Sequence, residues 1–201
     1  MAQQLTMNKF RVSVFCASSS KVDPKYIGPT EQLARGLVEA GWLIQYGGGG
    51  IGLMGALANT VLKHRGTIKG IIPQFMIDEG WVHIGVETLE IVPDMHERKR
   101  RIMVQTDAIV ALPGGCGTLE ELTEAITLKQ LGLIGCPILV VDLFGFYDPL
   151  LQFFDTMVEE RLLRPEHKKL WQVVNHASEV IPAIEKTSKW DSRSARNIAA
   201  I

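Results

Sequence analysis

Residues 112–121, Leu-Pro-Gly-Gly-Cys-Gly-Thr-Leu-Glu-Glu, have the composition of a loop that binds an anion and acts on a neighbouring group. They join an apolar run, residues 108–112, to a segment that favours a helix. Glycines let a backbone approach a ligand closely, and the free N–H groups of a helix N-terminus suit a phosphate. Glu120 and Glu121 follow in the same turn. Because carboxylates repel phosphate, we expect the loop to hold a phosphate while a glutamate faces another part of the same ligand, such as a sugar.

A second charged segment, residues 93–102, contains four consecutive cations, Arg98 to Arg101, near an expected helix start. Four consecutive residues of a helix point around its whole circumference, so some of these side chains must face inward. Arginine suits planar recognition of a phosphate or carboxylate, and lysine acts as a point charge. Cations oppose the dipole at a helix N-terminus. We therefore expect an anionic group, either a ligand phosphate or a glutamate, beside this segment.

Cleavage of an N-glycosidic bond is a reaction that these residue types could perform. Carboxylates stabilise the oxocarbenium-like sugar of such a reaction or activate water. On a helix, Glu120 and Glu124 are neighbours one turn apart, with Thr127 on roughly the same face, whereas Glu121 points elsewhere. The two adjacent glutamates are therefore expected to have different roles.

Apolar runs alternate with longer helical patterns along the chain. Expected strands cover residues 10–16, 42–46, 67–72, 88–92, 108–112 and 137–142, with a weaker one at 171–174; expected helices cover 24–40, 53–65, 95–106, 118–131 and 148–161. Most strands lack polar alternation, which indicates cover on both faces. The fold class is thus α/β, a doubly wound, mostly parallel sheet flanked by helices on both faces. We divide the chain into an N-terminal extension (1–9), a single catalytic domain (10–186) and a C-terminal tail (187–201).

Three loops rich in small or polar residues follow expected strands: residues 17–20, 47–52 and 113–118. In doubly wound sheets, ligands bind at the carboxyl ends of the strands. The second loop contains a formal G-x-G-x-x-G at residues 50–55, but the next strand carries no acid for a ribose diol and the chain has no Gly-Lys-Ser/Thr. These features disfavour a dinucleotide oxidoreductase and an ATP-hydrolysing P-loop protein.

Composition narrows the function further. The 201 residues carry a net charge of −1, which gives no electrostatic reason to bind nucleic acid or an anionic membrane. No apolar run has the length of a membrane span, and the first nine residues lack the apolar core of a secretion signal. Three cysteines show no metal-ligand spacing. We expect a cytoplasmic protein without a metal or a cofactor. Trp81, Trp171 and Trp190 could flank a base, although packing is the more ordinary interpretation.

Two motifs in the correct order resemble the LOG (Lonely Guy) family of cytokinin riboside 5′-monophosphate phosphoribohydrolases. Residues 113–121 match P-G-G-x-G-T-x-x-E, and residues 95–99 match M-H-x-R-K. The similarity extends over roughly residues 10–180. Many members carried the label "possible lysine decarboxylase", but here no lysine has an evident pyridoxal-phosphate context. Cys116 occupies the variable position of the first motif, and residues 75–89 match no obvious family pattern.

The resemblance implies a Rossmann-like homodimer that hydrolyses a nucleoside 5′-monophosphate, AMP or an N6-prenylated AMP, to free base and ribose 5-phosphate. It implies Arg98 and Glu121 as the catalytic pair. The substrate-binding residues that we expect are Gly114, Gly115, Gly117, Thr118, Glu120, Met95, Lys99, Ser18, Gly48, Gly49, Gly50, Glu79 and Thr127. Three alternatives stay open: a non-catalytic nucleotide-sensing module, a dinucleotide oxidoreductase and a self-associating structural protein.

Overall fold

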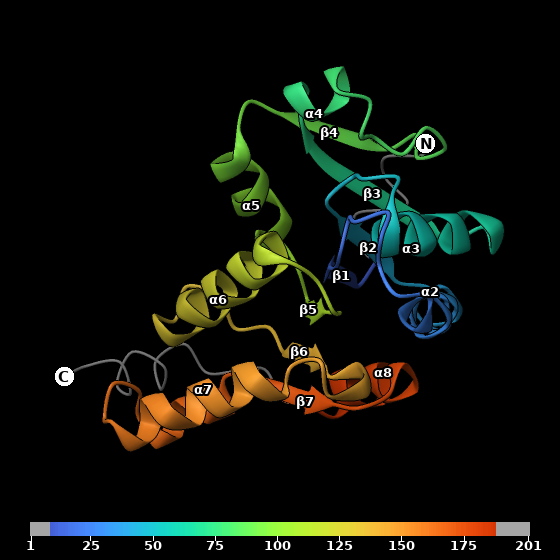
Figure 1. Ribbon diagram of the computed structural model, residues 1–201. Coiled ribbons are helices and arrows are strands. Elements are labelled where there is room, and N and C mark those ends of the chain that lie inside the picture. The colour runs from blue at the N-terminus through green and yellow to red at the C-terminus, as the bar shows by residue number, and fades with distance from the viewer. Residues whose placement is uncertain (1–8, 188–201) are drawn as a thin grey trace.

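A seven-stranded parallel sheet forms the centre of the computed structural model, which describes residues 9–187 (Figure 1). The strand order is β4-β3-β2-β1-β5-β6-β7, and every neighbouring pair is parallel. The strands are β1 (Arg11–Phe15), β2 (Leu43–Tyr46), β3 (Thr67–Pro73), β4 (Leu89–Val92), β5 (Ala108–Ala111), β6 (Ile138–Val141) and β7 (Gln172–Val174). The expected α/β, doubly wound fold is confirmed, and its named strands are entirely parallel.

Helices cover both faces of the sheet (Figure 1). One face carries α2 (Ile27–Glu39), α3 (Gly52–Lys63) and α8 (Val180–Lys186), and the other carries α5 (Met95–Met103), α6 (Cys116–Gln130) and α7 (Asp148–Glu159). The short α4 (Gln74–Asp78) follows β3 directly. Single 3-10 turns are η1 (Pro24–Tyr26), η2 (Leu143–Gly145), η3 (Pro165–Lys169) and η4 (Ala177–Glu179). None of the helices between residues 9 and 187 is long and apolar enough to cross a membrane.

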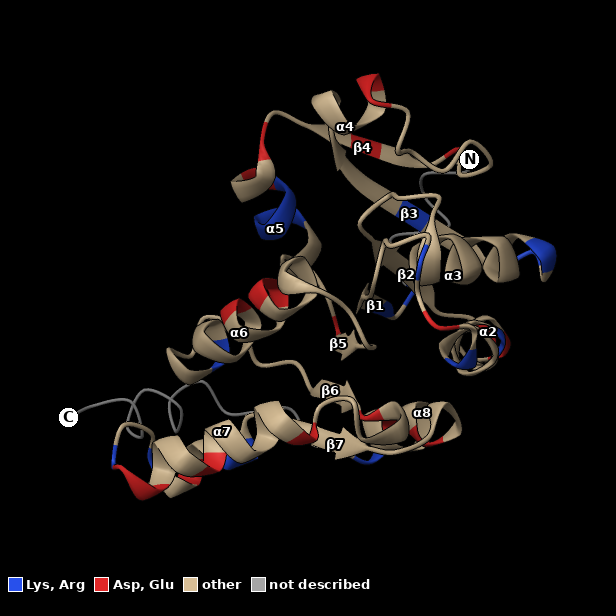
Figure 2. Ribbon diagram, in the orientation of Figure 1, with Lys and Arg blue, Asp and Glu red and all other residues tan. Residues whose placement is uncertain are grey.

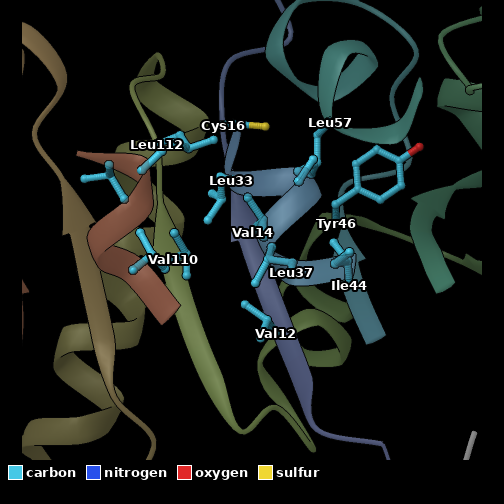
Figure 3. Packing of buried hydrophobic residues seen from close by; sticks show 14 of the residues in the cluster. Val12, Val14, Cys16, Leu33, Leu37, Ile44, Tyr46, Leu57, Val110 and Leu112 are labelled. Atoms are coloured by element: carbon cyan, nitrogen blue, oxygen red, sulfur yellow. The ribbon is translucent and has the colours of Figure 1, made fainter. Parts of the chain in front are cut away.

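Two apolar clusters hold these layers together, because successive side chains of a strand point to opposite faces. Val12, Val14 and Cys16 of the β1 segment pack toward Leu33 and Leu37 of α2 (Figure 3). Phe15 belongs to the opposite cluster, with side chains of α5, α6 and α7. The sheet is therefore buried on both sides, as the continuous apolar runs predict.

The chain changes direction across the sheet at β1. Strands β1 to β4 advance toward one edge, and β5 to β7 then fill the other side of β1. Such a reversal opens a crevice at the carboxyl ends of the two strands that flank it, here β1 and β5. The fold thus brings the loop after β1 and the loop after β5 to one place.

Element boundaries differ from the expected ones in two informative places. The expected helix 95–106 ends at Met103, because Val104 is extended and Gln105 takes a left-handed φ of 61°. The expected helix 24–40 begins as the 3-10 turn η1 before α2. The predicted extension 1–9 and tail 187–201 lie outside the described residues, apart from Lys9 and Thr187, as does Trp190.

Candidate active site

The three loops meet around one cavity of about 530 Å³ at the carboxyl edge of the sheet. Ala17 N donates to Pro113 O at 3.1 Å, and Leu53 N donates to Ala17 O at 2.9 Å, so the first loop bonds to the third loop and to the start of α3, the helix that follows the second loop. The predicted convergence is confirmed. The lining residues are Cys16, Ala17, Ser18, Gly47, Gly49, Ile51, Met54, Ile72, Met76, Trp81, Met95, Arg98, Gly115, Cys116, Gly117, Thr118 and Glu121.

One end of the cavity is the N-terminus of α6. The first backbone bond between Gly115 and the helix runs from Leu119 N to Gly115 O at 3.0 Å, so the N–H groups of residues 116–118 precede the helical ladder. Apart from its chain neighbours and the nearby backbone of α6, a Cβ atom on Gly115 or Gly117 would meet no protein atom within 4 Å. Both glycines line the cavity, and their backbone faces open space. An anion can therefore bind here to the backbone N–H groups of the helix N-terminus, with no glycine side chain in the way.

Gly114 has a different role, because it lets the loop close on α6. A Cβ atom there would lie 2.1 Å from Thr118 Oγ1 and 2.5 Å from Thr118 Cβ. Thr118 is itself buried. The first glycine of the motif thus serves packing, whereas Gly115 and Gly117 leave room for a ligand.

Arg98 is held rigidly in the wall of the cavity. Helix α5 begins after Asp94, whose carboxylate accepts from Glu97 N at 2.8 Å. Arg98, which is 6% exposed, donates from its guanidinium Nε to Ile71 O at 3.2 Å and from Nη2 to Gly47 O at 3.0 Å. A Cβ atom on Gly47 would lie 2.0 Å from Arg98 Nη2, so only glycine leaves this space. These two backbone carbonyl groups therefore fix the orientation of the Arg98 guanidinium.

Glu121 faces Arg98 from α6, with Oε1 of Glu121 3.7 Å from Nη1 of Arg98. Glu121 is 4% exposed. Burial raises the pKa of Glu121 to about 7, and the nearby Arg98 guanidinium lowers it in partial compensation. Near neutral pH, Glu121 can consequently be either a proton acceptor or a proton donor, which is typical of groups that act in acid–base catalysis.

The charge run of α5 divides between inside and outside, as predicted. Arg98 and Lys99 are buried, whereas Arg100 and Arg101 are exposed and pair with Glu97. Figure 2 shows this run in blue on α5. Lys99 Nζ lies 2.7 Å from Glu120 Oε1 and 2.9 Å from Glu124 Oε2. Adjacent glutamates of α6 thus face different cations, which confirms that Glu121 points away from the Glu120 and Glu124 face.

The cavity also has an apolar wall, formed by the side chains of Met54, Ile72, Met76, Trp81 and Met95. Trp81, which is 48% exposed, follows α4 and is positioned through backbone bonds to the second glycine loop. Gly50 N donates to Trp81 O at 3.0 Å, and Gly49 and Val82 form an isolated antiparallel bridge. These contacts hold an aromatic side chain in the same cavity as the anion loop.

Several predicted site residues lie together and others do not. Ser18, Gly49, Met95, Arg98, Gly115, Gly117, Thr118 and Glu121 line the cavity. Gly48, Gly50, Gly114, Lys99 and Glu120 adjoin the lining residues in sequence without lining it themselves. Glu79 is exposed at the end of α4, and Thr127 is exposed with its hydroxyl donating to Thr123 O at 2.9 Å. The structure does not bring these last two residues to the cavity.

Sequence reasoning did not select Cys16, Gly47, Met54, Ile72 or Met76, and it favoured packing for Trp81. Gly47 could have been found from its place at the end of an expected strand, whereas the apolar side chains give no pattern that separates them from core. Trp171 is buried in the core, as expected for packing. Among residues 9–187, no group of three or more His, Cys, Asp or Glu side chains could hold a metal ion.

The fold and the cavity together define a Rossmann-like α/β protein with an anion loop and a buried Arg–Glu pair. Residues 54–184 match the family described as "Possible lysine decarboxylase". The chain is 37% identical over 182 residues to the cytokinin riboside 5′-monophosphate phosphoribohydrolase LOG7 of Arabidopsis thaliana, covering 90% of this chain and 84% of that relative. It is 34% identical over 197 residues to LOG3 of the same plant, covering 98% and 92%. The chain belongs to the LOG family.

A solved structure shares the architecture at low sequence identity. The molybdenum cofactor carrier protein of Chlamydomonas reinhardtii superimposes with a TM-score of 0.69 at 18% identity, covering 89% of this chain and 98% of that one. This likeness concerns the fold alone. The predicted Rossmann-like fold and the predicted family are both confirmed.

Proposed function

We propose that this protein hydrolyses the N-glycosidic bond of a nucleoside 5′-monophosphate to free base and ribose 5-phosphate. The observation that carries the proposal is the buried Arg98–Glu121 pair, 3.7 Å apart, in the same cavity as the open N-terminus of α6. An anion site and a carboxylate in one cavity match a substrate that combines a phosphate with a sugar. Relatives named as cytokinin riboside 5′-monophosphate phosphoribohydrolases support the same reaction.

In the proposed mechanism, the N–H groups of residues 116–118 and the backbone of Gly115 and Gly117 bind the 5′-phosphate. The C–N bond to the base breaks, and positive charge develops on the sugar. The Glu121 carboxylate stabilises that charge and takes a proton from the attacking water, whose oxygen bonds to the anomeric carbon. The departing base takes up a proton from solvent, and Glu121 returns the proton of the attacking water to solvent, so the net reaction consumes one water molecule. Arg98 lowers the pKa of Glu121, which favours its ionised form, and assists departure of the base.

The base is proposed to lie along the apolar wall of the cavity, against Met76, Trp81 and Met95. An aromatic ring and thioether side chains suit the flat face of a purine and leave apolar surface for an N6 substituent. AMP and an N6-prenylated AMP are therefore the proposed substrates. The reaction as written consumes only water, in keeping with the expectation of no cofactor. We further propose a cytoplasmic homodimer that does not bind nucleic acid, with the net charge of −1 as support for the last point.

The test is incubation of the purified protein with AMP and with isopentenyladenosine monophosphate, followed by chromatography of the products. We expect free base from at least one substrate, none from adenosine, which lacks the phosphate, and none with Glu121→Gln. The substitution should spare nucleotide binding, because the carboxylate acts mainly in the transition state. Saturable binding of AMP without base release would instead identify a nucleotide-sensing module, and normal turnover by Glu121→Gln would remove Glu121 from the mechanism.

A further inference from the structure

Lys99 joins the two helices that carry the candidate catalytic pair. It follows Arg98 on α5, and its ammonium group bridges Glu120 and Glu124 of α6 at 2.7 and 2.9 Å. Only 10% of the Lys99 side chain is exposed, and it does not line the cavity. The same two helices meet again in the neighbouring Arg98–Glu121 pair. Lys99 thus directly follows Arg98 on α5, and Glu120 directly precedes Glu121 on α6.

The arrangement also balances charge around Glu121. Glu120 and Glu124 each raise the pKa of Glu121, and Lys99 lowers it. The hydrogen bond to Glu120 raises the pKa of Lys99 itself, so the ammonium stays charged over the working range. The two ion pairs hold the ammonium against α6, and Lys99 is not among the residues that line the cavity.

We propose that Lys99 is a positioning residue, which holds α5 against α6 and neutralises Glu120 and Glu124 beside the catalytic carboxylate, and that it does not bind the substrate. The inference rests on the proposed function, because it assigns Lys99 a part in that reaction. It differs from the expectation drawn from the motif resemblance, in which Lys99 and Glu120 contact the ligand.

The charged and titratable groups that face Glu121 come from three elements. Helix α5 supplies Arg98 and Lys99, α6 supplies Glu120 and Glu124, and the end of β1 supplies Cys16. Burial raises the pKa of Cys16 far above neutrality, so the thiol stays uncharged. The groups that can shift the titration of Glu121 are therefore the two cations and the two acids.

The experiment is the pH dependence of kcat and KM in a set of charge variants. Lys99→Met should move the acid limb of the profile to higher pH and lower kcat with little change in KM. Each pH unit of that shift costs tenfold in rate below the limb. Lys99→Arg should restore most of the loss. Glu120→Gln with Glu124→Gln should move the limb to lower pH, and the triple variant should return it toward the wild-type position.

Lys69→Met is the matched control, since Lys69 is also a partly buried lysine paired with a glutamate, Glu90, but it is not among the groups that shift the pKa of Glu121. Its profile should match the wild type. The inference is overturned if Lys99→Met leaves the acid limb in place, or if it raises KM and leaves kcat unchanged. Titration of the Glu121 carboxyl by ¹³C NMR in the same variants gives an independent readout. If the wild type releases no base, the proposed function fails, whereas an unshifted Glu121 titration in Lys99→Met refutes the role of Lys99 alone.

Discussion

Replacement of Glu121 by glutamine should abolish turnover and make the fold more stable at alkaline pH. Glu121 has a folded-state pKa of about 7 against the ordinary value of 4.5, because burial disfavours its charged form. A carboxyl with a raised pKa lowers stability above the folded pKa, and this cost disappears below the unfolded pKa. Wild-type stability should therefore fall as pH rises from 4.5 through 7. Glutamine has nearly the same shape and no charge to desolvate.

The size of the effect follows from the difference between the two pKa values. That difference makes ionisation of Glu121 cost about 3 kcal/mol more in the folded than in the unfolded state. About 2.5 kcal/mol of this cost should develop between pH 5 and pH 8. The free energy of unfolding of Glu121→Gln, relative to wild type, should grow by this amount over the same range.

Urea unfolding of both proteins at pH 5, 6, 7 and 8 measures the difference directly. Glu97→Gln serves as the control, since salt-bridge hydrogen bonds from Arg100 and Arg101 lower the pKa of Glu97 to about 2. Its stability contribution is present above pH 4.5 and lost as pH falls through about 2, so its difference from wild type should stay constant from pH 5 to pH 8. If the stability difference between Glu121→Gln and wild type is also constant over this range, then Glu121 does not have a raised pKa in the folded protein.

Three further substitutions test the geometry of the cavity. Gly47→Ala places a methyl group 2.0 Å from Arg98 Nη2 and should displace the guanidinium, with at least a tenfold fall in kcat. Gly28→Ala is the control, because the added methyl group meets no atom within 4 Å beyond its chain neighbours and its own helix backbone. An active Gly47→Ala would contradict the fixed position of Arg98. Gly114→Ala crowds Thr118 and should weaken binding of ribose 5-phosphate about tenfold by calorimetry, whereas unaltered affinity would argue against the anion loop. Trp81→Ala should lower kcat/KM for isopentenyladenosine monophosphate more than for AMP; equal losses would place the N6 substituent elsewhere.

The sequence was sufficient for the layers of the fold and the positions of the three loops. Continuous apolar runs indicated strands buried on both faces, and the helices expected over 24–40 and 118–131 end just before Gly41 and Gly132, which both have positive φ. The division of the Arg98–Arg101 run followed from helix geometry alone. These features depend on local periodicity and on backbone conformations that few residues adopt.

The residues that form the apolar wall of the cavity could not be predicted from the sequence in the same way. Helix α4 is only five residues long, which is too short for a clear hydrophobic periodicity. The hydrogen bond from Gly50 N to Trp81 O joins two loop segments, and no sequence pattern connects them. Whether a tryptophan fills a core or lines a cavity depends on what the fold brings opposite it. Likewise, the motif placed Arg98 and Glu121 in one site, but the carbonyls of Ile71 and Gly47 that fix Arg98 come from tertiary packing.

The central claim is that Glu121 and Arg98 act on the glycosidic bond of a nucleotide bound through its phosphate. Quantification of base and ribose 5-phosphate from AMP and from isopentenyladenosine monophosphate tests this claim most directly. We predict release of the two products in equal amounts, with loss of both in Glu121→Gln and in Arg98→Ala. Phosphate and nucleoside as the products, or equal rates in the wild type and both variants, would contradict it.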